Sequence, residues 1–143
     1  MEIIRATETW QQAGAYYVRI QAMARKHSIS LRKEFDEYDT PDTKYIVIMD
    51  GFLPIATGRL IFTSDTTAKI GRIVVLEEYR GKGIGRLVVS ECEKWLKEEG
   101  IISVSVDARE NKSGFYKKLG YIDKGEPIIK GDTFNCISME KTL

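Results

Sequence analysis

The sequence predicts an α+β fold with a mixed, mostly antiparallel sheet of six to seven strands, helices on both faces and a central parallel strand pair. A β-branched run, a glycine-rich loop and an amphipathic pattern follow one another over Ile73–Trp95, which indicates strand, turn and helix. The strand pattern Ile101–Ala108 comes next, and a crossover of this length makes the two strands parallel. Before this strand–turn–helix unit, strand patterns are joined by short turns, which favours antiparallel pairing of those strands.

Length and composition narrow the classes of protein to be considered. The 143 residues, 43% of them hydrophobic, fit one domain spanning 1–143. Because 22 basic residues balance 21 acidic ones, we expect neither nucleic acid nor a membrane surface as a partner. No apolar run has the length of a signal peptide core or a membrane span, so we expect a cytoplasmic protein. Cys92 and Cys136 lack metal-ligand spacing and only one His is present, which predicts reduced thiols and no metal site.

The first third of the chain predicts a short strand and two helices. Glu2–Ala6 is strand-like, and Thr7 or Thr9 can cap a helix that runs to about Ala24. We expect the sheet-facing side of that helix to carry Trp10, Ala13, Tyr17, Ile20 and Ala24. The charged stretch Arg25–Thr43 predicts a short second helix followed by a loop.

Three antiparallel strands are expected before the glycine loop. Lys44–Met49 and Leu53–Phe62 form a hairpin around Asp50-Gly51, a strong turn signal between two apolar runs. Pro54 lacks an N–H, which places its strand near a sheet edge or delays its pairing. Ala68–Val75 is the third strand.

The elements after the loop also follow from their patterns. Apolar residues at 84, 87, 88, 92, 95 and 96 predict a helix that Gly100 ends. Alternation in the next strand places on one side Ile102, Val104, Val106 and Ala108. Asn111–Leu119 predicts a short helix, and Tyr121–Ile129 with Phe134–Lys141 predicts a final hairpin.

The glycine-rich loop has the composition of a phosphate-binding turn. Gly81, Gly83 and Gly85 allow a sharp bend that leaves N–H groups bare at a helix start, where the helix dipole adds positive potential. The cations of the same loop suit a pyrophosphate better than a neutral ligand; they are Arg80, Lys82 and Arg86. A tight turn with a solvated basic edge is the alternative.

Other phosphate-binding motifs do not fit this loop. The dinucleotide fingerprint G-x-G-x-x-G requires glycine where Arg86 stands, and no Walker loop is present. The pattern that fits is Arg-x-x-Gly-x-Gly, carried by Arg80, Gly83 and Gly85. It resembles the coenzyme A pyrophosphate loop of the GNAT acyltransferase superfamily. A second stretch also resembles GNAT proteins, with matching residues Asn111, Phe115, Tyr116, Gly120 and Tyr121.

The resemblance implies the GNAT-like acyl-CoA N-acyltransferase fold and an activity. The expected reaction is acetyl transfer from acetyl-CoA to a primary amine, on a small molecule or a protein, by direct attack in a ternary complex. Two strands, Ala68–Val75 and Ile101–Ala108, would splay apart around the pantetheine arm. The resemblance gives the coenzyme contacts as Ile73, Val74, Val75, Arg80, Gly81, Lys82, Gly83, Ile84, Gly85, Arg86, Asn111 and Tyr116.

Catalytic roles follow from the same resemblance. The backbone N–H of Val75 would face the thioester carbonyl. Tyr116 would protonate the departing thiolate, since the ordinary pKa values of a tyrosine and a thiol, about 10 and 8.5, lie close together. Many GNAT enzymes carry a Glu base on the strand before the loop, where this chain has Lys69, Gly71 and Arg72. We favour Glu34 as the base.

Several alternatives stay open at the level of sequence. Other candidate bases are His27, Asp36, Glu37 or a chain of water molecules, and each charged residue could instead belong to a solvated helix face. The N-terminal part is loosely similar to small bacterial GNAT proteins through Val18-Arg19 and Asp39, but His27 and Cys136 replace the Gln and His of those relatives. A coenzyme A-binding regulatory or sensor domain without catalysis is the second function class, and a homodimer is left open.

Overall fold

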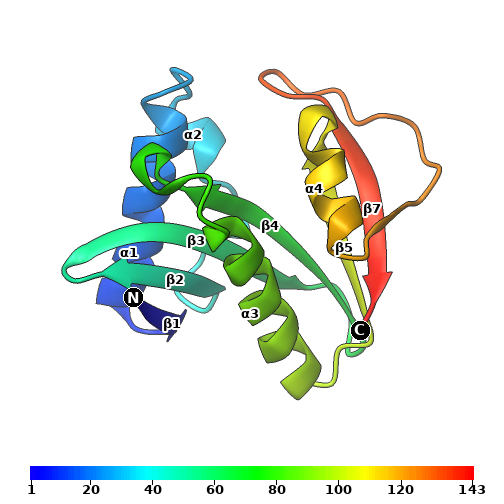
Figure 1. Cartoon of the computed structure of the whole chain (residues 1–143), viewed down its shortest axis with the longest axis horizontal. Coiled ribbons are helices and arrows are strands. Elements are labelled where there is room, and N and C mark those ends of the chain that lie inside the picture. Colours follow the sequence, from blue (N-terminus) through cyan, green and yellow to red (C-terminus); the bar gives the residue numbers. More distant parts are fainter.

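Seven strands form one mixed sheet in the computed structural model, which describes residues 1–143 (Figure 1). Their order is β1-β2-β3-β4-β5-β7-β6. The neighbours β4 and β5 are parallel and central, and the other pairs are antiparallel, so the predicted fold class is confirmed. The strands are β1 (Glu2–Ala6), β2 (Lys44–Asp50), β3 (Leu53–Phe62), β4 (Thr67–Val75), β5 (Ser103–Arg109), β6 (Ile122–Asp123) and β7 (Cys136–Thr142).

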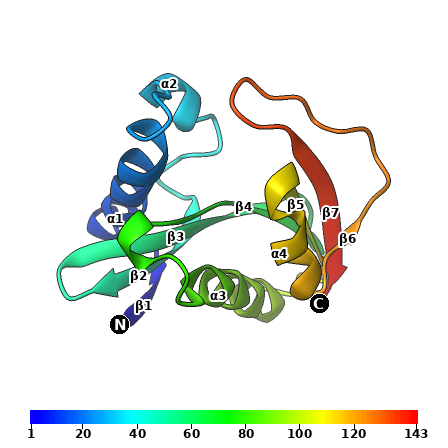
Figure 2. The ribbon, with the colours of Figure 1, turned by 45° about the horizontal axis from the view of Figure 1, so that its top comes forward.

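Helices cover both faces of the sheet, with α1 on one side and α3 on the other (Figure 2). None of them combines the length and the apolar character that a membrane span requires. The α-helices are α1 (Thr9–Arg19), α2 (Leu31–Glu34), α3 (Ile84–Glu98) and α4 (Ser113–Lys118). A π-helix, η1 (Ile20–Ala24), continues α1, and two short 3₁₀ turns are η2 (Glu77–Tyr79) and η3 (Glu110–Lys112).

Strand β2 is buried on both faces, which explains its continuous apolar sequence. Tyr45 and Val47 belong to the smaller apolar cluster, which includes Ala15 of α1. Ile46 and Ile48 point the other way, into the larger cluster that contains the buried side of α3. The pleat of one strand thus joins the two halves of the core.

The predicted buried face of α1 is wrong except at Ala24, which is buried at the end of η1. Trp10 and Tyr17 are 57% and 37% exposed, and the buried residues of α1 are Gln12, Gly14, Ala15, Val18 and Arg19. Close packing on the sheet selects small residues here, because a Cβ at Gly14 would lie 3.3 Å from Val47 Cγ1. The predicted cap is wrong as well, since Glu8 caps the helix in a capping box with Gln11.

Three further strand predictions need correction. Strand β3 lies inside the sheet, and Pro54 is accommodated beside a register shift between Ile48 and Met49, where a bulge tolerates the missing N–H. The first arm of the expected C-terminal hairpin is strand only at Ile122–Asp123, with one isolated bridge at Ile129. Ile102 is 56% exposed because it precedes β5.

We expect Gly58→Ala to lower the free energy of unfolding by about 1–3 kcal/mol, the cost of overpacking a core. The added Cβ would lie 2.7 Å from Val88 Cγ1 and 3.1 Å from Cys92 Sγ, so β3 and α3 would have to separate. Gly71→Ala on the neighbouring strand is the control, since its Cβ meets nothing within 4 Å. Urea unfolding of both variants measures the effect, and equal stabilities would contradict this account of the β3–α3 contact.

Candidate active site

The site begins where the two parallel strands separate. Strands β4 and β5 pair only from Thr67 with Ser103 to Ile70 with Val106. Beyond Ile70, β4 pairs with β3 alone, and the end of β5 pairs with β7 alone. An opening between the two strands therefore leads from the middle of the sheet towards the loop after β4.

The free edge of β4 presents backbone groups to this opening. Leu76 N–H donates to Ile55 O at 2.8 Å, so the alternating ladder directs the N–H and C=O of the preceding residue, Val75, away from β3. Continuing the alternation, Val74 faces β3 and Ile73 faces the opening. The register shift after Thr57 and the positive φ of Arg72, 50°, mark a bulge that bends this edge.

Of the three β4 residues predicted to contact the coenzyme, two face the opening. The Val75 carbonyl accepts a hydrogen bond from Arg80 Nε at 3.1 Å, which leaves its N–H as the free donor. Val74 is buried in the core and its backbone is committed to β3, so we withdraw it from the expected contacts. Ile73 keeps its backbone on the free edge.

The glycine loop ends at the N-terminus of α3. Gly81 and Gly83 both have φ +77°, a conformation that side chains disfavour, and an added Cβ would meet no atom within 4 Å. Gly83 is the N-cap and no side chain caps the helix, so the first-turn N–H groups are free. Arg80, Lys82 and Arg86 are exposed around them, whereas the Ile84 side chain is buried and offers only its backbone.

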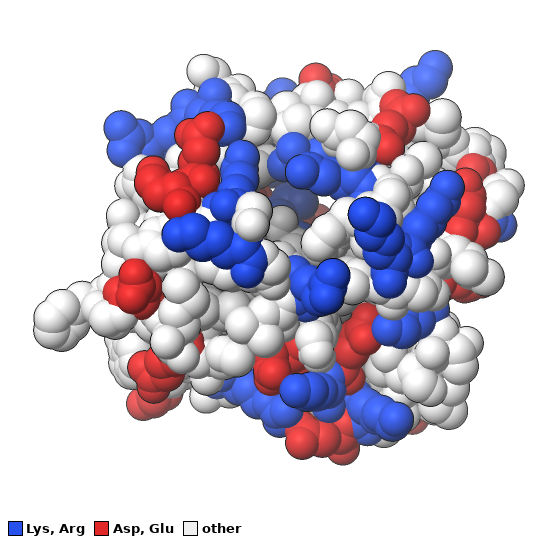
Figure 3. Space-filling view, viewed as in Figure 1, with Lys and Arg blue, Asp and Glu red and all other residues white.

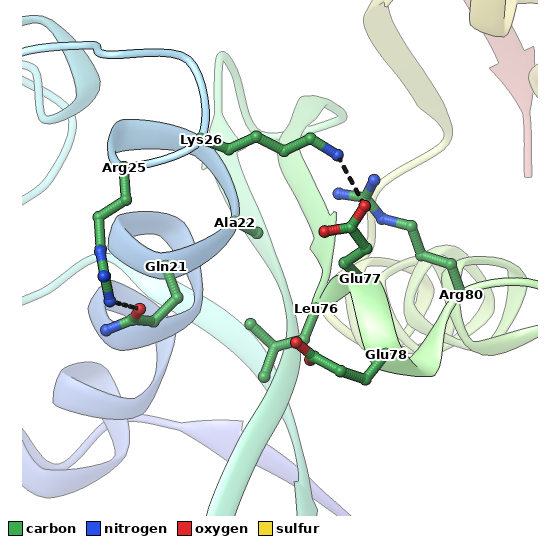
Figure 4. Close-up of a pocket in the computed structure, with 8 residues that line it drawn as sticks. All are labelled: Gln21, Ala22, Arg25, Lys26, Leu76, Glu77, Glu78 and Arg80. Carbon is green, nitrogen blue, oxygen red and sulfur yellow. Dashed lines mark hydrogen bonds and ion pairs between the residues drawn. The ribbon is translucent and has the colours of Figure 1, made fainter.

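A pocket of about 410 Å³ lies between η1 and this loop (Figure 4). Lys26 reaches across its mouth to Glu77, with Nζ 3.3 Å from Oε1, and Arg80 stands beside the pair. Leu76 and Ala22 form the apolar floor. The pocket extends the basic side of the loop towards α1.

Tyr116 lies at the far side of the opening with its ring packed and its hydroxyl free. The residue is 8% exposed, and its ring meets Phe115 and Tyr121 edge-on at 5.0 and 5.7 Å between centroids. The hydroxyl makes no hydrogen bond but is not sealed from solvent, since Arg59 Nε is the only fully buried side-chain polar atom without a partner. Burial raises the pKa of Tyr116, so the phenol keeps its proton at neutral pH.

Gly85 is the point where the two sequence motifs meet. A Cβ there would lie 3.5 Å from the Phe115 ring of α4 and 3.9 Å from Val75 Cγ2 of β4. The loop, the strand edge and the second motif are therefore neighbours around one opening. Asn111 is exposed in η3 near the same rim.

Glu34, the predicted base, lies on the α2 side but is bound to two arginines. Its Oε2 is 3.0 Å from Arg19 Nε and 3.2 Å from Arg72 Nε, and its side chain is 4% exposed. Its carbonyl also accepts hydrogen bonds from both arginines. The buried carboxylate is enclosed by these two guanidiniums and is not presented to an acceptor amine, so we withdraw Glu34 as the base. The carboxylate instead ties α2 to the bulge of β4.

Asp39 completes this ion network on the same side of the sheet. It accepts hydrogen bonds from Arg19 at 2.6 Å and from Tyr45 at 2.7 Å. Burial alone would raise the pKa of Asp39, but these hydrogen bonds outweigh it and hold the pKa below its ordinary range. Arg59 links Asp39 to Asp36, so three arginines balance three carboxylates.

A second cluster bridges the two sides of the opening. Phe134, in the loop before β7, stacks edge-on against His27 after η1, with centroids 5.1 Å apart. Arg109 at the end of β5 lies 3.7 Å from the centre of the same ring, and its Nη2 is 3.2 Å from Met23 Sδ. A salt bridge from Lys33 to Asp132 joins the same two segments. Figure 3 shows Lys and Arg side chains around a hollow on this face.

The comparisons with known proteins agree with this geometry. The model of the Acetyltransferase (GNAT) family matches residues 6–121. The chain belongs to the GNAT acetyltransferase family. It is 34% identical over 123 residues to YyaT of Bacillus subtilis (strain 168), covering 85% of this chain and 82% of that protein. The resemblance stated from the two motifs is thereby confirmed.

The similarity to solved structures covers nearly the whole chain. A Lactobacillus plantarum protein assigned as an N-acetyltransferase has a TM-score of 0.93 and 29% identity, with 99% of this chain and 97% of that chain covered. An aminoglycoside 6'-N-acetyltransferase in complex with coenzyme A has a TM-score of 0.78 at 16% identity, with 99% and 97% covered. At that identity the second likeness shows the fold alone.

The site of this GNAT protein contains residues that sequence reasoning missed. Arg109 lies on the side of β5 opposite the buried Val106 and Ala108, and a charged residue at the end of this strand could have been recognised as a candidate site residue. Arg59 lies within an otherwise apolar strand run, which also marks a buried ion pair. Phe134 gave no local signal, because its contact with His27 joins segments over a hundred positions apart.

We expect Asp39→Asn to lower the free energy of unfolding by about 3 kcal/mol, since losing one partner leaves a buried guanidinium uncompensated. Because the folded-state pKa of Asp39 is lowered, its contribution is complete above about pH 4, near the ordinary pKa, and is lost only as the pH falls through the lower folded-state pKa, so most of it remains at pH 3. Asp42→Asn, at an exposed carboxylate with no ion pair, is the control. Denaturant unfolding at pH 7 measures both variants, and equal stabilities would refute the role of the charge.

Proposed function

We propose that this protein is an acetyl-CoA-dependent N-acetyltransferase that acts on a primary amine of a small molecule or a protein. The observation that carries the proposal is the opening between β4 and β5, which offers a free strand edge and ends at a glycine loop and a helix N-terminus. The edge can hold an amide-bearing arm, and the helix N-terminus can hold a diphosphate. A thioester substrate with both groups, such as acetyl-CoA, fits this order of features.

In this proposal the coenzyme is held mainly by backbone groups. The backbone of Ile73 binds a pantetheine amide as a strand would, Val75 keeps its N–H for the thioester carbonyl, and the first-turn N–H groups of α3 bind the pyrophosphate. Arg80, Lys82 and Arg86 add charge around those N–H groups. The coenzyme A complex of the aminoglycoside 6'-N-acetyltransferase, which shares the fold, supports coenzyme A as the ligand.

The chemistry proposed is direct attack of the amine nitrogen on the thioester carbonyl. The Val75 N–H donates to the carbonyl oxygen as negative charge develops on it. As the C–S bond breaks, Tyr116 donates its hydroxyl proton to the departing sulfur. Burial raises the pKa of Tyr116, which keeps the donor protonated but widens its gap to the pKa of the thiol, so the proton moves only as negative charge develops on the sulfur.

The attacking amine must lose a proton, and no carboxylate is proposed as its acceptor. Glu34 and Asp36 are committed to arginines, and Asp107 is paired with Lys69. Glu37 is exposed in the turn after α2, and His27 packs on Phe134. We therefore assign proton removal to water in the opening.

We expect Gly83→Val to abolish acetyl-CoA binding, because the side chain disfavours φ +77° and would crowd the pyrophosphate. Gly100→Val is a matched control with φ +86° and open space, at the opposite end of α3 from the loop. Thermal shift with acetyl-CoA, and with ATP and NADH as non-ligands, measures binding. If the folded Gly83→Val variant is stabilised by acetyl-CoA as strongly as Gly100→Val, the loop assignment fails.

We expect Tyr116→Phe to lower kcat by about 10²-fold with the Kd for acetyl-CoA nearly unchanged, because the ring packing is kept while the proton is lost. Tyr121→Phe, which removes a neighbouring hydroxyl bonded to Glu93, is the control variant. Steady-state kinetics with thiol detection give kcat, and melting curves check folding. A kcat within about twofold of the wild type would mean that Tyr116 only packs the site.

A further inference from the structure

Arg109, at the end of β5 beside the opening, has no carboxylate partner. The ion pairs of the protein include Arg19, Arg59 and Arg72 but not Arg109. Its only hydrogen bond goes to the sulfur of Met23, a weak acceptor. Its guanidinium is half-buried, and burial together with the charge of Arg80 lowers its pKa. Since an arginine stays protonated, this charge needs an anion for full compensation.

The protein does not supply that anion. Glu34, whose charge acts on Arg109, is already bound to Arg19 and Arg72. Asp107, two residues earlier on the same side of β5, is paired with Lys69. The network of α2 has equal numbers of arginines and carboxylates, so Arg109 leaves this end of the opening with a positive charge.

The guanidinium is held in a way that leaves its edge available. One face lies 3.7 Å from the centre of the Phe134 ring, which fixes its plane. Nε and Nη1 make no hydrogen bond, yet they are not sealed from solvent, since Arg59 Nε is the only fully buried nitrogen without a partner. A planar edge with free donors suits the two oxygens of a carboxylate or a phosphate.

We propose that Arg109 binds an anionic group of the acceptor, so that the substrate is an amine that also carries a carboxylate or a phosphate. This inference rests on the proposed function, and it deepens it by naming the acceptor class. The position is appropriate, because the charge of Arg109 also acts on Tyr116, the proposed proton donor to the departing thiolate.

Matched amines test the proposal on the whole protein. The pairs are L-leucine with isopentylamine, L-lysine with 1,5-diaminopentane, and O-phosphoethanolamine with ethanolamine, and the last pair separates phosphate from carboxylate. In each pair, we expect wild-type kcat/KM to be about 10- to 100-fold higher for the amine that carries a carboxylate or phosphate than for the amine without it, which is the range of a charge-assisted hydrogen bond. Arg109→Gln should remove that preference, and Arg109→Lys should restore part of it. Arg32→Gln, at an exposed arginine of α2 without an ion pair, is the control and should keep it.

Three outcomes would overturn the proposal. The first is an equal preference in wild type and Arg109→Gln, and the second is a wild-type preference for the diamine or the neutral amines. The third is a rise in the KM for acetyl-CoA in Arg109→Gln with the acceptor preference intact, which would assign Arg109 to the coenzyme. Thermal shift of the coenzyme A-bound protein by the same amines gives a readout without turnover. If acetyl-CoA itself neither binds nor is consumed, the proposed function fails, and stabilisation by anionic amines in wild type but not in Arg109→Gln still decides the role of Arg109.

Discussion

The loss of pairing between β4 and β5 is the constraint on which the site depends. A parallel pair that continued to Val75 and Arg109 would consume the backbone groups of both strands and close the sheet. Instead pairing stops at Ile70 and Val106, and each strand keeps its other neighbour. The bulge at Arg72 and the ion pairs from Arg72 to α2 hold β4 on its side. Strand β7 holds β5 on the other side.

The segments that flank the opening are held by different kinds of force. Beside the glycine loop, Gly85 allows Phe115 and Val75 to approach, and apolar packing positions α3 and α4. Around α2, ion pairs hold the segment in place, because the helix is only four residues long and its one buried residue is Glu34. A buried ion network is a weak source of net stability but fixes geometry, since any displaced partner leaves an uncompensated charge. Glu34 thus has a positioning role at the place where sequence comparison suggested a base.

The charge distribution distinguishes this site from one made for a polycation. Four carboxylates lie close together in the sequence at the end of α2 and just after it, namely Glu34, Asp36, Glu37 and Asp39. In the fold each of Glu34, Asp36 and Asp39 forms an ion pair with an arginine, and Arg109 has no carboxylate partner. The polarity of the opening is therefore opposite to the one that the local sequence suggests. Only the partners of each charge reveal this, because the arginines come from α1, β3 and β4.

The sequence by itself determined the elements whose signals are local. The glycine loop, the crossover, the β2–β3 hairpin and the parallel pair all follow from turn residues and periodicity over short stretches, and the structure confirms them. The two motifs also sufficed for the family. Tertiary structure decided the buried face of α1, the short β6, the ion-paired state of Glu34 and the free charge of Arg109. These depend on contacts between segments far apart in the chain, and burial of an arginine or exposure of a tryptophan is set by what packs against it, which periodicity does not encode.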